Sequence, residues 1–326
     1  MQWKGCIVKA NERANFFSPL PAKFGIGITL AVEVILFSQL SPYFFTAENI
    51  LNVSLQLSIT AIIAAGMTFV ILTSGIDLSV GALVAFTGVI SASVAKLSLP
   101  IFVSLPLAVA AGLMVGAVSG AFAGVCVTRY AITPFIATLA LMTIFRGAAY
   151  IFTDGRPIWE LPQQFALLAG GRVFGVPIPT LIMIFVYIGA YIVLEWTRFG
   201  RYVYAVGGNK EAARLAGINT NRILIGVYVI CGVLTSLSGI LLASRVNSGQ
   251  PNAGLMYELD VIAAVVVGGT SLSGGRGTII GTLLGAVLIG VLRNGLNLLD
   301  VNSYVQQVVV GFVILITVMM DQLRKK

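Results

Sequence analysis

The side chains that could do chemistry in this chain are neutral hydrogen-bonding groups placed inside apolar segments. Amides and hydroxyls exchange hydrogen bonds with an uncharged, polyhydroxylated solute without requiring a counter-charge. Such groups also join neighbouring helices inside a membrane, so both roles stay open at this point. Six of them are candidates for a solute pathway: Gln56, Ser58, Thr60, Thr68, Asn294 and Asn297.

The sequence contains no pattern of a catalytic or metal site. It has no histidine, and its three cysteines, Cys6, Cys126 and Cys231, are widely spaced. This excludes histidine-based catalysis, a Cys-x-x-Cys redox pair and a zinc site of His and Cys ligands. The phosphate-binding Walker A pattern is also absent from the sequence. We therefore expect no catalytic residue, metal or cofactor in this chain.

A glycine-rich stretch at 268–277 lacks the Lys-Ser/Thr pair that would hold phosphate and magnesium. We interpret it as a turn between two apolar segments. The alternative is a surface that touches a separate nucleotide-hydrolysing subunit.

The composition predicts a membrane protein. Hydrophobic residues make up 58% of the 326 residues and charged residues 10%, whereas soluble domains carry about 25% charged residues. So few charges cannot cover a water-exposed surface, and much of the chain must face lipid. Disordered, coiled-coil and nucleic-acid-binding chains need far more polar surface, so these classes are excluded.

Apolar segments of about 17 to 25 residues predict an all-α, polytopic membrane helix bundle with about ten transmembrane helices. The eighth segment is short and rich in glycine, so we expect it to be broken or only partly lipid-facing. Small residues at every fourth position from Gly112 to Gly124 predict closely packed helices. The predicted spans are 24–41, 50–73, 78–95, 101–127, 131–153, 178–196, 223–244, 259–272, 278–296 and 304–321.

The positions of Lys and Arg predict that the N- and C-termini are both cytoplasmic. The net charge is +8. With the N-terminus inside, 14 of the 20 basic residues fall in cytoplasmic segments and four outside, as the positive-inside rule requires. The charge therefore needs no nucleic-acid partner. The predicted parts are an N-terminal tail (1–23), a transmembrane domain (24–321) with a periplasmic loop (154–177) and a cytoplasmic loop (197–222), and a C-terminal tail (322–326).

Three acidic residues lie where predicted spans begin. Asp77 precedes the third span, and Glu258 and Asp260 start the eighth. A carboxylate there can cap the helix and oppose its positive end. A gating contact with solute or partner is the alternative, because ionisable groups at membrane depth are costly without a reason.

The cytoplasmic loop contains a segment typical of a short helix. Asn209 can be its N-cap and Gly217 its stop. Ala212, Leu215 and Ala216 share one face. We interpret this segment as a helix that docks on a soluble partner, with a connector lying on the membrane surface as the alternative. The candidate coupling residues are Asn209, Lys210, Glu211, Arg214, Leu215 and Gly217.

Several blocks of sequence, in order, resemble the permease subunits of bacterial ATP-binding-cassette importers of the ribose type. The resemblance runs from Leu40 to Asp321 and rests on several blocks together. They are SPYFFT at 41–46, GMTFVILTSGIDLSVG at 66–81, PFIATL at 134–139, GRY at 200–202, GGN at 207–209 and YELDVIAAVVVGGTSL at 257–272.

This resemblance implies a multi-pass protein of the bacterial inner membrane that translocates a monosaccharide by alternating access. Members of the family carry ribose, allose, xylose or arabinose. The resemblance also implies a cytoplasmic ATPase subunit that binds ATP and Mg, a periplasmic sugar-binding protein and a second permease copy, expected to form a homodimer. The segment 209–217 matches the coupling position of the family.

Three basic residues on the outer side, Arg156, Arg172 and Arg245, are candidates for docking the binding protein. They would face carboxylates on that partner. Two other classes of function remain as alternatives. One is an ion-coupled secondary sugar transporter that acts without an ATPase, and the other is a passive channel or membrane scaffold.

Overall fold

Each of the ten predicted apolar spans coincides with a helix in the computed structural model, which describes residues 22–323. Residues 1–21 and 324–326, most of the two predicted tails, lie outside the described residues. The ten helices are α1 (Ala22–Leu40), α2 (Ala47–Leu72), α3 (Val80–Ala95), α4 (Ile101–Arg129), α5 (Pro134–Phe152), α7 (Ile178–Trp196), α10 (Thr220–Arg245), α11 (Tyr257–Val267), α12 (Ile279–Leu298) and α13 (Ser303–Leu323).

Six of these helices, α2, α4, α5, α7, α10 and α12, are long and apolar enough to cross a membrane. Apolar stretches at 26–40, 80–95 and 303–317 are shorter. Large apolar side chains such as Phe102, Ile151 and Phe185 are exposed on the outer surfaces of the helices, as lipid-facing side chains would be. The chain is therefore a polytopic helical membrane protein.

The two long loops contain structure that hydropathy alone did not predict. The loop 154–177 holds α6 (Gln163–Gly170) and an antiparallel hairpin of β1 (Arg172–Val173) and β2 (Val176–Pro177). The loop 197–222 holds two helices, α8 (Arg198–Gly208) and α9 (Lys210–Leu215), where one was predicted. Thr197 caps α8 by accepting a hydrogen bond from the Gly200 N–H at 3.2 Å, as N-cap threonines do.

Glycines bring α4 and α10 into direct backbone contact. Gly116 of α4 lies against Gly232 of α10, and Gly120 lies against the backbone of Tyr228. A Cβ atom at either position would overlap with α10. The small residues predicted to allow close packing therefore do so, because van der Waals contact rather than apolar burial holds helices together in lipid.

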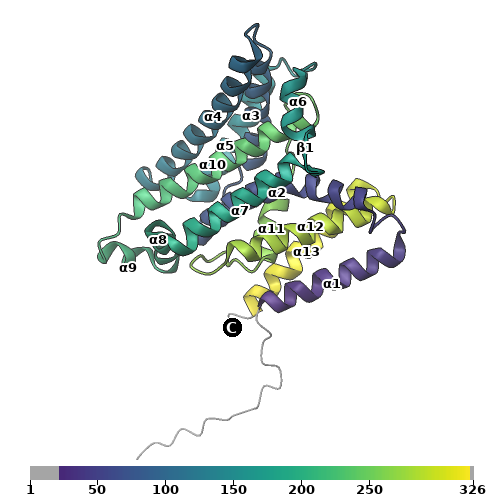
Figure 1. Cartoon of the computed structure of the whole chain (residues 1–326). Helices are drawn as coiled ribbons and strands as arrows, with labels where there is room; N and C mark the ends of the chain where they lie inside the picture. The colour runs from purple at the N-terminus through teal and green to yellow at the C-terminus, as the bar shows by residue number, and fades with distance from the viewer. Residues whose placement is uncertain (1–21, 324–326) are drawn as a thin grey trace, which may run out of the picture.

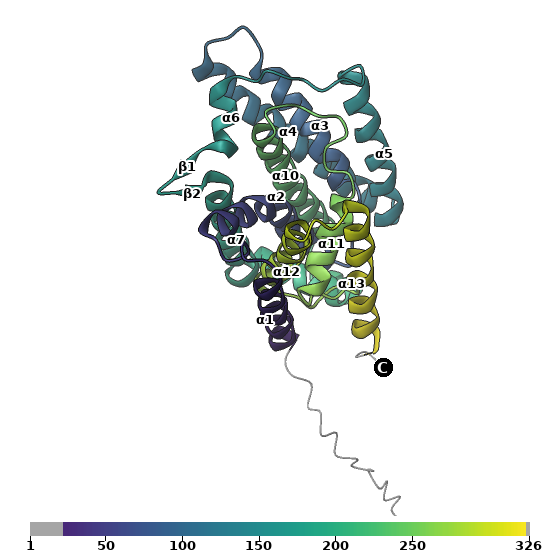
Figure 2. The same cartoon turned by 90° about the vertical axis from the view of Figure 1, so that its right-hand side faces the viewer.

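Helix α2 forms the centre of the molecule. Every residue from Ala61 to Leu72 is buried, and α2 packs against α7, α10, α11 and α12. In Figures 1 and 2, α3, α4, α5 and α10 form one group of helices, and α1 and α13 lie on the other side next to α12. Helix α2 thus joins the two groups.

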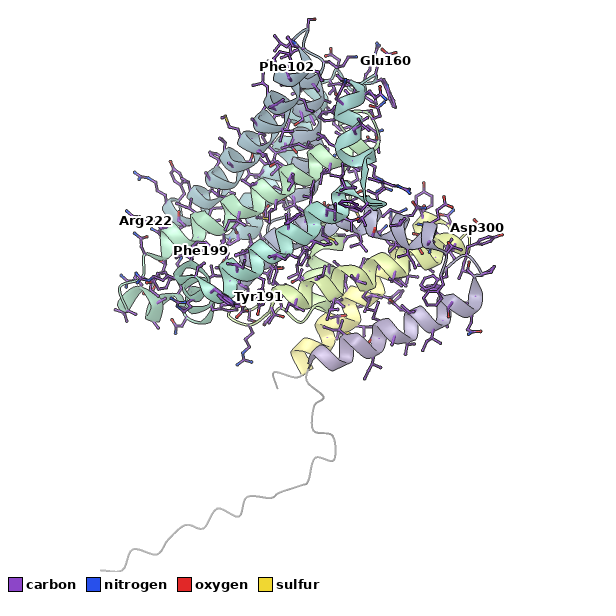
Figure 3. The ribbon with its side chains drawn as sticks, in the orientation of Figure 1. Phe102, Glu160, Tyr191, Phe199, Arg222 and Asp300 are labelled. Carbon is purple, nitrogen blue, oxygen red and sulfur yellow. The ribbon has the colours of Figure 1, made fainter. Side chains whose placement is uncertain are left out.

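The segments predicted to be cytoplasmic contact one another. The Gly275 N–H donates to the Leu72 carbonyl at 2.9 Å. The Ser74 hydroxyl donates to the Ser273 carbonyl at 2.8 Å. In Figure 3, Arg222 and Phe199 lie together at the end of the molecule that holds α8 and α9.

The segments predicted to be periplasmic form a second set of contacts. Ile158 and Gly249 exchange two backbone hydrogen bonds of 2.9 Å. Lys96 Nζ donates to the Trp159 carbonyl at 2.8 Å. In Figure 3, Glu160 and Phe102 lie at the end of the molecule remote from Arg222. The loops thus fall into two groups of contacting segments. This is expected if successive spans cross the membrane in alternating directions.

The segment 246–256, between α10 and α11, is not helical and runs back into the bundle along α3. Gly249 lies against Ala92, and Gly254 lies against Gly81. From Ala92 to Gly81, at 1.5 Å per helical residue, the segment therefore follows α3 for about 16 Å. Irregular backbone at such depth is tolerated only where protein or a cavity surrounds it. Arg146 supplies partners by donating to the carbonyls of Pro251 at 2.9 Å and Ala253 at 2.7 Å.

Helix α11, which follows, has 11 residues, about half of the 20 that a full span needs. The helix in the predicted eighth span is therefore short but uninterrupted, and an irregular segment precedes it. The helix also ends earlier than predicted, at Val267 rather than at residue 272, because Gly268 to Leu272 begin the turn toward α12.

Candidate functional site

A cavity of about 370 Å³ opens among α2, α11 and α12, close to the end of α10 and the start of α13. This volume lies within the range of small-molecule sites. Its apolar wall includes Leu57, Ala264 and Ile289. The polar residues that line it are Gln56, Thr60, Arg245, Tyr257, Asp260, Arg293, Asn297 and Gln306.

An ion pair between two neighbouring helices forms part of the cavity wall. Arg293 Nη2 of α12 lies 2.6 Å from Asp260 Oδ1 of α11. The Asp260 side chain is 8% exposed and that of Arg293 is 34% exposed. A carboxylate this buried requires a charged partner. The Nε of Arg293 is buried and makes no hydrogen bond among the described residues.

Three of the six predicted pathway residues line this cavity. Gln56 and Thr60 lie one turn apart on α2, and Asn297 lies near the end of α12. Asn297 Oδ1 accepts a hydrogen bond from Gln306 Nε2 at 2.7 Å. The structure therefore brings these three side chains to one place.

The other three candidates, Ser58, Thr68 and Asn294, join helices instead of lining the cavity. Asn294 and Asn49 form a reciprocal amide pair at 2.8 and 3.0 Å. The Thr68 hydroxyl lies 2.8 Å from that of Thr282 on α12. Ser58 lies within 3.4 Å of the Thr180 hydroxyl. All three are buried, and hydrogen bonds within α2 or to neighbouring helices satisfy their polar groups.

Asp77 stabilises the turn before α3 rather than the first turn of the helix itself. The predicted start of this span at residue 78 is two residues too early, because α3 begins at Val80 with Ser79 as its N-cap. Asp77 Oδ1 accepts hydrogen bonds from the Ser79 N–H at 2.9 Å and the Ser79 hydroxyl at 2.6 Å. These bonds fix the chain in a tight turn between α2 and α3.

Glu258 and Asp260 lie in the first turn of α11, as the sequence predicted. The Glu258 carboxylate also reaches the first turn of α3, where its Oε2 contacts Gly81 so closely that a larger residue would not fit. A negative charge is favoured at this positive end of a helix. Glu258 therefore links the start of α11 to the start of α3.

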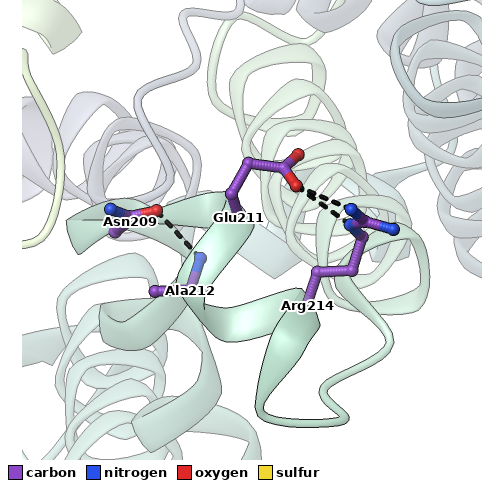
Figure 4. A network of polar contacts seen from close by, with 4 residues as sticks. All are labelled: Asn209, Glu211, Ala212 and Arg214. Atoms are coloured by element: carbon purple, nitrogen blue, oxygen red, sulfur yellow. Dashed lines mark hydrogen bonds and ion pairs between the residues drawn. The ribbon is translucent and has the colours of Figure 1, made fainter.

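Helix α9 has the local structure predicted for the coupling segment. Asn209 Oδ1 accepts a hydrogen bond from the Ala212 N–H at 2.9 Å, and Arg214 pairs with Glu211 at 2.9 Å (Figure 4). Gly217 follows with φ of +83° and ends the turn. Leu215 is 81% exposed, and Ala212, Ala216 and the Lys210 side chain are also exposed. The helix therefore presents a small apolar face with charged flanks.

Helix α8 connects α9 to the helices of the cavity. The Gly207 backbone lies against the carbonyl of Leu72, the last residue of α2. The Tyr204 hydroxyl donates to the Gly277 carbonyl at 2.9 Å, two residues before α12. Burial, with a smaller contribution from Glu195, raises the pKa of Tyr204 to about 12, so this hydroxyl remains a donor at neutral pH. A displacement of α9 would thus be transmitted to α2 and α12.

A second cavity, of about 530 Å³, lies at this end of the molecule. It is bordered by Thr73, Thr128, Asn209, Lys210 and Tyr228. The buried stretch of α2 from Ala61 to Leu72 separates it from the first cavity. These two cavities therefore lie toward opposite predicted sides of the membrane.

The three arginines predicted to dock a binding protein fall into two environments. Arg156 and Arg172 are exposed in the loop that carries α6 and the hairpin. Arg245 is the last residue of α10 and lines the first cavity. Among residues 22–323, no group of three His, Cys, Asp or Glu side chains could hold a metal ion.

Three cavity residues, Tyr257, Arg293 and Gln306, were not among the predicted site residues. Arg293 is one of two arginines inside predicted spans, and an intramembrane charge is by default a functional hypothesis. Gln306 is a buried amide in the last predicted span. Both signals are present in the sequence, but interpreting them requires knowing which helix lies next to Arg293 and Gln306.

Comparison with known proteins gives consistent matches over most of the chain. Residues 49–318 match the family described as branched-chain amino acid transport system / permease component. The chain is 50% identical to the ribose import permease protein RbsC of Escherichia coli (strain K12) over 298 residues, 90% of this chain and 92% of the relative. Identity to the Bacillus subtilis (strain 168) protein of that name is 46%, over 98% of both chains.

A third relative, the D-allose transport system permease protein AlsC of Escherichia coli (strain K12), is 36% identical over 98% of this chain and 97% of its own length. The family description mentions amino acids, whereas all three relatives carry the name of a sugar. No solved structure gives a significant match to the chain.

Proposed function

This chain belongs to the ribose-type permeases of ATP-binding-cassette sugar importers, and we propose that it carries D-ribose or a closely related aldose. A permease of this kind is the non-catalytic, membrane-spanning component of its importer. The choice of ribose follows the names of the relatives with 46 to 50% identity, ahead of allose at 36%.

The observation that supports the mechanism is the path of contacts from α9 to the cavity. Leu215 and its neighbours would dock on a cytoplasmic ATPase subunit that binds ATP and Mg. Movement of α9 would pass through Gly207 to the end of α2 and through Tyr204 to the start of α12. Both helices line the first cavity. Closure of that cavity and opening of the second would complete alternating access, driven by the different affinities of the two states for the partners.

The proposed topology has ten spans in a bacterial inner membrane, with both termini in the cytoplasm. The two sets of loop contacts support it, since the segments expected on one side contact one another. Helix α11 together with the irregular segment 246–256 would count as a single crossing. The proposed parts are a tail at 1–23, a transmembrane domain at 24–321 and a tail at 322–326.

The proposed partners are a cytoplasmic ATPase, a periplasmic sugar-binding protein and a second copy of this permease. The exposed Arg156 and Arg172 would meet carboxylates of the binding protein. In this arrangement Arg245 would act at the mouth of the cavity.

Two measurements test this proposal. The first is uptake of labelled D-ribose by vesicles that contain this chain with the ATPase and binding protein of a ribose importer, with and without ATP inside. Uptake that requires all three proteins and ATP is expected, and uptake by the permease alone under an ion gradient would contradict it. The second is labelling of single cysteines by an impermeant reagent, after the three native cysteines have been replaced by serine or alanine. Leu215→Cys should react only from the cytoplasmic side and Arg156→Cys only from the periplasmic side.

A further inference from the structure

We propose that the cavity among α2, α11 and α12 is itself a binding site for a neutral aldose, formed within one permease chain around the ion pair of Asp260 and Arg293. The inference rests on the proposed function, since it assumes that a sugar is the solute. It adds a site in the permease that binds sugar without the periplasmic binding protein.

The cavity collects polar groups that the helices leave unpaired. The Gln56 amide and the Tyr257 hydroxyl line it, and neither makes a side-chain hydrogen bond among the described residues. The buried Nε of Arg293 also lacks a partner within that part of the chain. An unpaired polar group is costly where it is buried, as Arg293 Nε is, whereas the exposed Gln56 amide and the half-buried Tyr257 hydroxyl are free to bond a ligand. Their gathering around one space indicates a ligand that supplies the missing hydrogen bonds.

The ion pair suits vicinal hydroxyls. Each sugar hydroxyl both donates and accepts hydrogen bonds, and here a carboxylate acceptor and a guanidinium donor lie side by side, 2.6 Å apart. Because Asp260 and Arg293 neutralise each other, this pair itself requires no charged ligand, and Arg245 is the remaining charged side chain in the lining. Leu57, Ala264 and Ile289 offer an apolar wall for the C–H face of a sugar ring.

The place of this pair in the fold also favours a solute site. Tyr257 and Asp260 lie in the first turn of α11, directly after the irregular segment that enters the bundle. Transporters place substrates at such discontinuous helices. Arg293 lies on α12, which starts two residues after the Gly277 carbonyl that Tyr204 binds. A shift of α12 against α11 would therefore change the site when α8 and α9 move.

The test is equilibrium binding of radiolabelled D-ribose to the permease–ATPase complex in lipid nanodiscs, without binding protein. We expect saturable binding by the wild type. Tyr257→Phe and Gln56→Leu should each weaken it about 2- to 12-fold, the effect of losing one hydrogen bond. Tyr191→Phe, on α7 in an apolar groove away from this cavity, is the matched control and should bind like the wild type.

Thermal unfolding of each variant separates binding from folding. Because the Tyr257 hydroxyl has no partner in the described part of the chain, its removal should leave the unfolding temperature unchanged. Competition with D-ribonate tests the class of ligand, since the sugar acid should compete less well than D-ribose.

Each outcome decides the matter. Absence of saturable binding, with uptake by the full importer intact, overturns the site and leaves the proposed function in place. Wild-type affinity in both Tyr257→Phe and Gln56→Leu overturns the assignment to this cavity, and stronger competition by D-ribonate overturns the neutral class. A full importer that takes up no ribose would overturn the proposed function and this inference together.

Discussion

The backbone of Gly207 in α8 lies directly against the carbonyl oxygen of Leu72, the last residue of α2. The same carbonyl accepts a hydrogen bond from the Gly275 N–H at 2.9 Å. The loop that carries α9, the central helix and the turn before α12 therefore meet at one point. There is no room for a side chain at position 207, so the contact is a rigid joint between the coupling loop and the helices of the first cavity.

Gly207→Ala should damage this joint. The added Cβ would collide with the Leu72 carbonyl and approach the Gly275 nitrogen to 2.7 Å, and backbone at both places cannot yield easily. We expect a loss of about 1–3 kcal/mol in stability and reduced uptake per assembled complex. Thermal unfolding and vesicle uptake would measure these effects. Gly208→Ala is the control, because a Cβ there meets nothing within 4 Å; equal behaviour of the two variants would refute the joint.

Leu215→Asp should weaken association with the ATPase while the permease remains folded. The side chain is 81% exposed, so its replacement removes little packing within the chain, but it places a charge on the proposed docking face. Loss of a central anchor typically costs about 2 kcal/mol or more. Co-purification of the ATPase measures the effect. The matched control is Leu97→Asp, at an exposed leucine in a segment predicted to be periplasmic, and a similar loss there would argue against docking at α9.

Asn294→Ala should act on stability rather than on sugar choice. The substitution leaves the buried Asn49 amide without the partner that it contacts at 2.8 and 3.0 Å. An unsatisfied buried polar group costs about 1–3 kcal/mol, so the unfolding temperature should fall. The ratio of D-ribose uptake to D-allose uptake, measured on the variant that remains folded, should not change. A changed preference between these sugars would instead indicate that Asn294 lines the solute pathway.

Combined charge reversal at Arg156 and Arg172, both to Glu, should weaken docking of the binding protein. Both residues are exposed on the loop that carries α6 and the hairpin, so assembly with the ATPase should be unaffected. Because surface charges mainly set the association rate, the defect should shrink as ionic strength rises. Uptake measured against binding-protein concentration at low and high salt provides the check. Equal uptake by variant and wild type at low salt would exclude this docking surface.

Local features of the fold were readable from the sequence because they depend on neighbouring residues. Apolar segments of bilayer length gave the ten helices, and Asn209 with Gly217 marked the ends of the α9 segment. The helical periodicity of α2 also separates the cavity residues from the helix-joining ones. Gln56 and Thr60 are four residues apart and share a face, whereas Ser58 points to another side of the helix.

Long-range features were not readable in the same way. The polar helix α8 has no hydropathy signal, although Thr197 marks its start. The entry of segment 246–256 into the bundle depends on contacts with α3 and Arg146. The pairing of Asp260 with Arg293 joins residues 33 positions apart on different helices, so it requires knowledge of how α11 and α12 pack.

We propose that this chain opens and closes a path for the sugar and that a separate ATPase drives the movement. The most direct test compares ATP hydrolysis and D-ribose uptake in proteoliposomes that contain the permease alone or the permease with its ATPase and binding protein. We expect neither activity for the permease alone, and ATP-dependent uptake for the permease with its ATPase and binding protein. Hydrolysis of ATP by the purified permease, or ribose uptake by it without the ATPase, would contradict the account.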